Sequence, residues 1–165
     1  MSNIVLREAT FDDAKIIFDL SNDEQVRANS IKKNLIEWQN HLKWLKIRLT
    51  DDNYKIFLFF FENNFIGQVK FEISPPEAII SISIHNDFRG KGLSAIILKR
   101  AIECFLRKNN AIKSIFALIR PENVSSIKSF SKTGFVYSKN ELINQEQFFK
   151  FIYSNRAYGN SETQH

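Results

Sequence analysis

The sequence predicts an α/β domain built on a mixed β-sheet, and three observations lead to this prediction. Three strand-like stretches follow one another between residues 54 and 85, which indicates an antiparallel meander. A strand, a glycine-containing turn and a helix then follow without a break over residues 79–108. The whole order, β-α-α-β-β-β-α-β-α-β-β, differs from the regular alternation of a doubly wound fold.

The length and composition fit one globular domain. The chain has 165 residues, so we expect a single domain over residues 1–154 and a polar tail over 155–165. It has no membrane-length apolar run and no signal peptide, and its one cysteine, Cys104, excludes disulfide frameworks and zinc clusters. We therefore expect a cytoplasmic protein without a bound metal. The net charge of +5 suits an anionic ligand, but the basic residues are scattered, so neither nucleic acid nor membrane is expected as a partner.

The first third of the chain predicts one strand and two helices. Ile4 to Ala9 alternates apolar and polar residues, as a strand does, and Thr10 or Asp12 can cap the helix that follows it. Residues 24–34 lack periodicity and predict a loop or a short helical turn. Leu35 to Leu49 carries an apolar stripe at helical spacing and predicts an amphipathic helix.

The remaining elements follow from strand alternation, turn residues and caps. Polar turn residues join the first two strands of the meander, and Pro75-Pro76 breaks the chain before the third. Asn123 can cap the last helix and Gly134 can end it. The predicted strands are Tyr54–Phe61, Phe65–Ile73, Ala78–His85, Lys113–Ile119, Phe135–Lys139 and Phe148–Ser154, and the predicted helices are Leu93–Lys108 and Asn123–Thr133.

The turn Arg89-Gly90-Lys91-Gly92 predicts an anion-binding site. Its glycines allow the backbone to approach a ligand, and free N–H groups at a helix start favour phosphate. Arg89 and Lys91 add positive charge, and arginine can bind phosphate through two donors. The alternative is a turn whose glycines only make room. A Walker A motif does not fit, because Lys91 precedes Gly92, and a dinucleotide site is the weaker reading, because the next strand does not end in an acid.

Two motifs resemble those of the GNAT acetyltransferases. Arg89 to Ser94 is similar to the R-x-x-G-x-G/A signature, with Ser94 in place of the final small residue. Asn123 to Phe135 is similar to the N-x-x-A-I-x-x-Y-x-x-x-G-F segment, with Ser126 in place of alanine and Phe130 in place of tyrosine. The resemblance extends over about Ile4 to Tyr153 and implies the GNAT fold, with acetyl-CoA as the acetyl donor.

This resemblance also implies how acetyl-CoA is bound. The sheet would splay between the strands Ile79–His85 and Lys113–Ile119, and the pantetheine arm would pair with the backbone of Ile82 and Ile84. Asn123 is similar to a residue that contacts the cofactor arm. The pyrophosphate would be held by the backbone N–H groups of Arg89, Gly90, Lys91, Gly92, Leu93 and Ser94.

A narrower resemblance concerns the acceptor. The pattern of Asn, Arg, Ser, Trp and His residues between Asn22 and Trp44, followed by Gly67 to Phe71, resembles GNATs that acetylate nucleotide-linked amino sugars, including those of pseudaminic-acid biosynthesis. It implies a small amine acceptor such as a UDP-linked amino sugar. The alternatives are a peptide acceptor and a non-catalytic acyl-CoA-binding module; a homodimer is also compatible. The residues expected to bind the acceptor are Arg27, Asn29, Ser30, Trp38 and Gln68.

Acetyl transfer to an amine needs a base for the ammonium proton, and the sequence offers two candidates. His41 follows Trp38 on the helix expected to wall the acceptor site, and its neutral form can accept a proton near pH 7. His85 ends the splayed strand. The alternative reading makes His41 a packing residue and His85 an exposed one. Phe130 has no proton to give to the departing thiolate, so another group or water must supply it.

Overall fold

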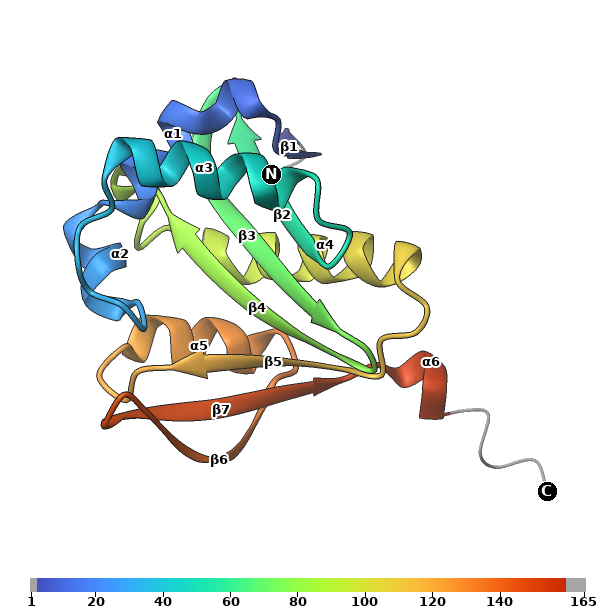
Figure 1. Ribbon diagram of the computed structural model, residues 1–165. Helices are drawn as coiled ribbons and strands as arrows, with labels where there is room; N and C mark the ends of the chain where they lie inside the picture. The colour runs from blue at the N-terminus through green and yellow to red at the C-terminus, as the bar shows by residue number, and fades with distance from the viewer. Residues whose placement is uncertain (1–2, 160–165) are drawn as a thin grey trace.

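The computed structural model describes residues 3–159 and has one mixed sheet with helices on both faces (Figure 1). The strands are β1 (Ile4–Glu8), β2 (Tyr54–Phe61), β3 (Asn64–Ser74), β4 (Glu77–Ile84), β5 (Ser114–Ile119), β6 (Val136–Ile143) and β7 (Glu146–Ser154). The helices are α1 (Ala14–Ser21), α2 (Glu24–Asn29), α3 (Trp38–Leu49), α4 (Leu93–Lys108), α5 (Val124–Lys132) and α6 (Arg156–Gly159), with short 3-10 turns η1 (Phe11–Asp13) and η2 (Asn86–Phe88).

The seven strands lie in the order β1-β2-β3-β4-β5-β7-β6. Only β4 and β5 run parallel among these neighbours; every other pair is antiparallel. This arrangement confirms the predicted meander and the predicted mixed sheet. It also places the two halves of the chain on either side of the β4–β5 pair.

The sheet alternates its side chains between two hydrophobic cores, as the period of two in a strand requires. On β2, Phe57 and Phe59 pack toward α4, whereas Ile56 and Leu58 pack toward α1 and α3. Figure 1 shows α3 on one face of β2 and β3, with α4 on the opposite face. No helix within residues 3–159 is both long and apolar enough to span a membrane.

Several element boundaries differ from those predicted. Helix α3 begins at Trp38 rather than Leu35. The Asn22 side chain donates from Nδ2 to the carbonyl of Ile36 and accepts at Oδ1 from the N–H of Ile36, both at 2.8 Å, and these two hydrogen bonds hold that segment extended. The final hairpin is longer than expected, since Asn144 and Gln145 both adopt positive φ and form a tight two-residue turn. The expected polar tail forms α6 over Arg156–Gly159, and its last residues lie outside the described chain.

Candidate active site

The β4–β5 pair opens into a cleft. These strands pair at only three positions, ending with Ile79 opposite Phe116, and they then diverge (Figure 1). In the described chain, residues 80–84 therefore present a strand edge toward the cleft that has no strand partner. The predicted splay is confirmed at the predicted pair of strands.

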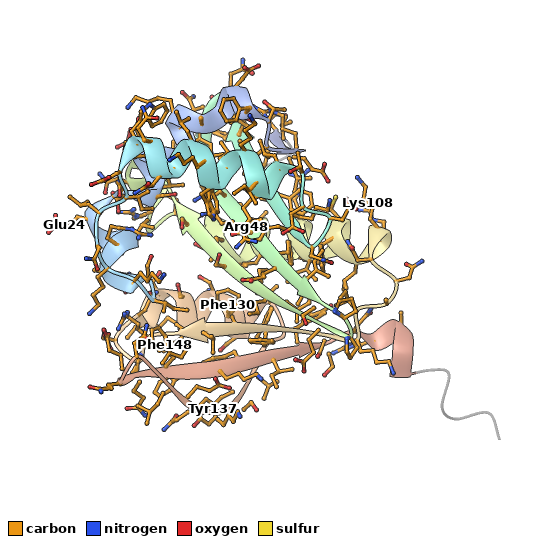
Figure 2. The ribbon with its side chains drawn as sticks, in the orientation of Figure 1. Glu24, Arg48, Lys108, Phe130, Tyr137 and Phe148 are labelled. Carbon is orange, nitrogen blue, oxygen red and sulfur yellow. The ribbon has the colours of Figure 1, made fainter. Side chains whose placement is uncertain are left out.

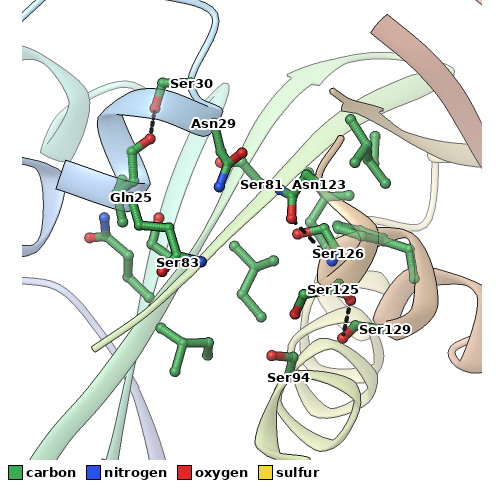
Figure 3. A pocket seen from close by; sticks show the side chains of 18 of the residues that line it. Gln25, Asn29, Ser30, Ser81, Ser83, Ser94, Asn123, Ser125, Ser126 and Ser129 are labelled. Atoms are coloured by element: carbon green, nitrogen blue, oxygen red, sulfur yellow. Dashed lines mark hydrogen bonds between the residues drawn. The ribbon is translucent and has the colours of Figure 1, made fainter. Parts of the chain in front are cut away.

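The cleft has a volume of about 360 Å³ and is bounded by β3, β4, β5, α2, and the beginnings of α4 and α5. Figure 3 shows Ser81 and Ser83 of β4 between Gln25 and Asn29 of α2 on one side and Ser94, Ser125 and Ser129 of the two later helices on the other. We call the side formed by the β4 edge, the following turn and the start of α4 the donor wall. We call the side formed by β3, α2 and the segment after α2 the acceptor wall.

The turn of the donor wall is shaped for an anion by its backbone. Gly90 and Gly92 have φ of +71° and +72°, a region that residues with a Cβ rarely adopt. No hydrogen bond among the described residues uses the backbone N–H of Gly90, Lys91 or Gly92. These groups precede the sixteen-residue helix α4, whose dipole also favours a negative charge at its start.

The Arg89 side chain is engaged elsewhere. Its guanidinium donates to the Asp23 carboxylate at 2.6 Å, to Gln25 Oε1 at 3.1 Å and to the carbonyl of Ile84 at 3.0 Å. It therefore ties the turn to the start of α2, and these contacts occupy the donors that the sequence suggested for phosphate. Lys91 Nζ lies 5.2 Å from the centre of the Phe88 ring. The groups of the turn that can donate hydrogen bonds to an anion are therefore its backbone N–H groups.

The polar face of the acceptor wall comes from the register of β3 and β4. Gln68 is paired with Ser83 and Lys70 with Ser81, so these four side chains share one face of the sheet. Gln68 is 1% exposed, and its Nε2 lies 3.5 Å from Ser21 Oγ. Its Oε1 is buried and has no hydrogen-bond partner. An unpaired buried carbonyl is costly, which makes Gln68 Oε1 a candidate acceptor for an N–H or O–H of a ligand.

Lys70 carries a second unsatisfied group. Its Nζ lies 4.8 Å from the centre of the Trp44 ring and forms no hydrogen bond or ion pair with a described residue. Burial, with a smaller contribution from the nearby charge of Arg27, lowers the pKa of Lys70 to about 8. Lys70 is therefore a cation that loses its proton more easily than an exposed lysine.

The segment after α2 is held over the end of the cleft by two arginines. Arg27 donates to the carbonyls of Ser21 and Lys32 at 2.6 and 3.0 Å, and to Ser30 Oγ at 3.1 Å. Arg120, at the end of β5, reaches across the cleft to the carbonyl of Ser30 at 2.7 Å and also binds the Glu146 carboxylate. These contacts join the two halves of the sheet at the mouth of the cleft.

Helix α5 contributes the opposite boundary. Asn123 caps this helix by accepting a hydrogen bond from the Ser126 N–H at 3.3 Å, as predicted, and it also lines the cleft. Phe130 is 3% exposed and lies on the β5 half of the molecule (Figure 2). Its ring lines the cleft at the position where a tyrosine was expected from the motif, so the nearby proton donors are the hydroxyls of Ser126 and Ser129.

The two predicted bases do not line the cleft. His41 is buried beneath α1, and its Nε2 lies 2.8 Å from the carbonyl of Ala14. Burial lowers the pKa of His41, which favours the neutral ring, and the Nε2–H then donates to that carbonyl. The centres of the Trp38 and Trp44 rings lie 5.7 and 5.9 Å from that of His41, so His41 is the packing residue of the alternative reading, and Trp38, which was expected to bind the acceptor, does not line the cleft. His85 accepts from the Asp87 N–H at 3.3 Å and faces a separate hollow near Phe88.

The remaining predicted residues divide in the same way. Those that line the cleft are Arg27, Asn29, Ser30, Gln68, Ile82, Ile84, Arg89, Gly90, Ser94 and Asn123. Lys91 and Gly92 lie in the turn beyond the lining, and Leu93 packs into the hydrophobic core. Sequence reasoning missed Ser81 and Arg120, whereas Lys70, like Gln68, is a polar residue on an otherwise apolar strand pair, which strand alternation allows to face either the cleft or solvent. The pairing of Lys70 with Ser81 could be inferred from strand alternation, but the reach of Arg120 across the cleft has no sequence signal.

Comparisons with known proteins agree with this geometry. The family model described as the acetyltransferase (GNAT) domain matches residues 3–136. No curated protein sequence matches the chain. A spermidine N-acetyltransferase from Vibrio cholerae, solved with CoA and spermine, is 20% identical, with 96% of this chain and 99% of that chain covered and a TM-score of 0.87. An aminoglycoside acetyltransferase solved with coenzyme A is 14% identical, with 97% and 99% covered and a TM-score of 0.79.

Proposed function

This chain belongs to the GNAT acetyltransferase domain family, and we propose that its acceptor is the primary amine of a small molecule that carries negative charge, such as a nucleotide-linked amino sugar. As a family member it is an acyltransferase that uses acetyl-CoA and acetylates an amine. The proposal concerns the identity of that amine. It is supported by the charges of the acceptor wall.

The donor wall fits acetyl-CoA. The strand edge at residues 80–84 offers backbone groups to the pantetheine arm, and the free N–H groups from Gly90 to Gly92 suit a pyrophosphate. When bound, acetyl-CoA supplies a thioester carbonyl that an amine can attack. The protein contributes mainly by holding the amine in position, since direct transfer needs no enzyme nucleophile.

The observation that carries the proposal is the sign of the charges around the cleft. Its described lining contains Arg27, Lys70 and Arg89 but no aspartate or glutamate. Glu24 lies on α2 beside the cleft, but its side chain points away from the body of the protein (Figure 2). The Asp23 carboxylate is already bound to Arg89.

Polyamines and aminoglycosides carry several positive charges, and a site for them needs carboxylates. Such acceptors would meet Arg27 and Lys70 without a counter-charge. A phosphate-bearing acceptor would instead be attracted by the same two cations. Its sugar hydroxyls and amine can hydrogen-bond Gln68 of the acceptor wall and the neighbouring Ser81 and Ser83 of β4, which all line the cleft.

The test is a thiol-release assay with acetyl-CoA and a panel of acceptors: UDP-linked amino sugars, spermidine, spermine, aminoglycosides and short peptides. We expect turnover of a UDP-linked amino sugar and little turnover of the polycations. Preference for spermidine or spermine would overturn the proposal, and preference for peptides would indicate protein acetylation.

A matched pair of variants sharpens this test. Ser81→Asp places a carboxylate opposite Lys70, whereas Ser81→Asn adds similar bulk without charge. We expect Ser81→Asp, and not Ser81→Asn, to raise KM for the UDP-linked amino sugar and to lower KM for spermidine, because the added carboxylate changes the charge that the acceptor meets. Equal effects of the two variants would contradict an electrostatic choice of acceptor.

A further inference from the structure

The cleft lacks the groups that usually accept a proton in acyl transfer. Its described lining contains no histidine, carboxylate, cysteine or tyrosine. The ionisable residues among that lining are Arg27, Lys70 and Arg89. Arginine does not lose its proton in proteins, and a serine hydroxyl is a poor base without a partner. Lys70 is therefore the remaining side chain of the lining that can exchange a proton near neutral pH.

The placement of Lys70 differs from that of other lysines in the chain. Lys15 pairs with Asp19 at 2.6 Å, and the largely buried Lys150 lies 3.9 Å from Glu141. Lys70 lines the cleft and has no carboxylate partner among the described residues, and its Nζ lies 4.8 Å from the centre of the Trp44 ring. A lysine without a counter-charge in such a position is stabilised when it becomes neutral.

The groups that face Lys70 all act in this direction. Arg27 approaches from α2 and, after burial, lowers the pKa of Lys70. Burial and, to a smaller extent, the charge of Lys70 lower the pKa of His41 on α3, so the His41 ring is neutral and adds no charge near Lys70. On the flanking strands, Ile56 of β2 and Ser81 of β4 stand opposite Lys70 and carry no charge. A fraction of the protein therefore has a neutral Lys70 amine at mildly alkaline pH.

We propose that Lys70 is the proton acceptor of the acetyl transfer, an inference that rests on the proposed function of the cleft. The neutral Lys70 amine takes one proton from the acceptor's ammonium group. The freed amine nitrogen then forms the N–C bond to the acetyl carbon while the C–S bond breaks. A second N–H proton leaves the nitrogen for the sulfur, and the proton on Lys70 returns to solvent.

Serines at the edge of the cleft can relay the second proton. Ser126 and Ser129 line the cleft on α5, beside Phe130. The Ser129 hydroxyl donates to the carbonyl of Ser125 at 3.0 Å and must release this hydrogen bond before it acts, so the Ser126 hydroxyl is the more direct relay of a proton toward the sulfur in place of the missing tyrosine. Lys70 and these serines then stand on opposite sides of the cleft, and each handles one of the two protons that the amine loses.

The first experiment measures Lys70 directly and needs no acceptor. Heteronuclear NMR of protein isotopically labelled at lysine would follow each Nζ during a titration from about pH 6 to about pH 11, a range in which lysine changes from charged to neutral. Comparison with the Lys70→Arg variant would identify the Lys70 signal. We expect one lysine to titrate near pH 8 and its signal to vanish in Lys70→Arg. A Lys70 that titrates with the exposed lysines overturns the inference.

The second experiment uses the amine that wild type turns over fastest in the acceptor panel. Lys70→Met removes the amine, and Lys70→Arg keeps the charge but cannot act as a base. We expect both variants to lower kcat by about 100-fold or more at pH 7.5. Calorimetric affinity for CoA should stay unchanged, and Lys99→Met on the exposed side of α4 should behave as wild type.

The pH dependence separates a base from a structural residue. At a pH above the pKa of the acceptor's ammonium group, the amine is already neutral and needs no proton acceptor before attack. The loss of kcat in both Lys70 variants, relative to wild type, should therefore shrink as pH rises. A deficit that stays constant with pH, or a Lys70→Arg variant with wild-type activity, overturns the inference. If the wild-type protein turns over no amine, the proposed function is overturned instead. The NMR titration then still shows whether Lys70 loses its proton near pH 8.

Discussion

The two walls of the cleft present different kinds of groups to a ligand. The donor wall offers backbone: an unpaired strand edge at residues 80–84 and the N–H groups of a turn with two left-handed glycines. The acceptor wall offers side chains, and two of them, Gln68 and Lys70, end in groups that no described residue satisfies. A backbone wall binds what is common to all acyl-CoA donors, whereas a side-chain wall can select one acceptor.

This difference also separates the walls energetically. In the donor wall, Gly90, Lys91 and Gly92 are exposed, so leaving their N–H groups unpaired when no ligand is present costs little. Gln68 Oε1 is buried without a partner and Lys70 is a half-buried cation without a counter-charge, so both lower the stability of the folded chain. The acceptor wall is therefore the side on which function and stability conflict, and substitutions there should improve folding while they impair turnover.

The largest effect on stability is expected at Lys70. Its pKa falls from 10.5 to about 8 on folding, which corresponds to a cost of up to about 3 kcal/mol below pH 8. Because the folded state releases its proton first, the unfolded state binds more protons between pH 8 and 10.5, and wild-type stability rises with pH in that window. Lys70→Met should thus be more stable than wild type at pH 7, with a difference that shrinks toward pH 10.5.

Urea unfolding of both proteins at several pH values measures this difference. Lys99→Met serves as the control, because Lys99 is exposed and its removal should leave the pH dependence unchanged. A Lys70→Met protein that is less stable than wild type at every pH would show that the contact with Trp44 outweighs the desolvation of the cation. The contrast between the two walls would then fail on the acceptor side.

The next effect in size is expected at the donor wall. Gly92 has φ of +72° and no atom within 4 Å of an added Cβ, so the main effect of Gly92→Val is to force valine into an unfavourable backbone conformation. That conformation costs about 1–2 kcal/mol, and relaxation of the turn would misdirect its N–H groups. We expect CoA affinity to fall about tenfold or more by calorimetry.

Ser94→Ala is the matched control for the donor wall, since it removes a lining side chain from the same helix start but leaves the backbone unchanged. It should alter CoA affinity by less than about threefold. If Ser94→Ala weakened CoA as much as Gly92→Val did, the donor wall would depend on side chains as well, and the comparison would lose its basis.

The donor wall was the more predictable one, for physical reasons. Two glycines ahead of an amphipathic helix and an alternating strand before them are local signals, and the turn followed from them, whereas the splay was expected from the resemblance to the GNAT family. Asn123 as a helix cap and Gly134 as a stop are local as well, and the structure has both. The start of α3 was misplaced because its cause is a contact between Asn22 and Ile36, fourteen residues apart.

The acceptor wall depends on contacts that the sequence does not encode locally. The choice of His41 as a base relied on its residue type and helix position, but its ring lies under α1 with Nε2 bound to Ala14. Arg89 suggested a phosphate ligand, yet its partner is Asp23, sixty-six residues away. Gln68 was expected at the acceptor and does line the cleft, because the period of two along β3 could place it there.

The smallest expected effect is at Gln68, and it tests the comparison most directly. Gln68→Met keeps the side-chain length and removes the buried Oε1 that has no partner, so we expect the free energy of unfolding to rise by about 1 kcal/mol. If Gln68 Oε1 receives a hydrogen bond from the acceptor, the same variant should raise the acceptor KM severalfold and leave CoA affinity unchanged. Higher stability with an unchanged KM would mean that Gln68 is a strained packing residue. Lower stability would mean that its contact with Ser21 outweighs the unpaired carbonyl, so that on this wall an unsatisfied group does not mark where the acceptor binds.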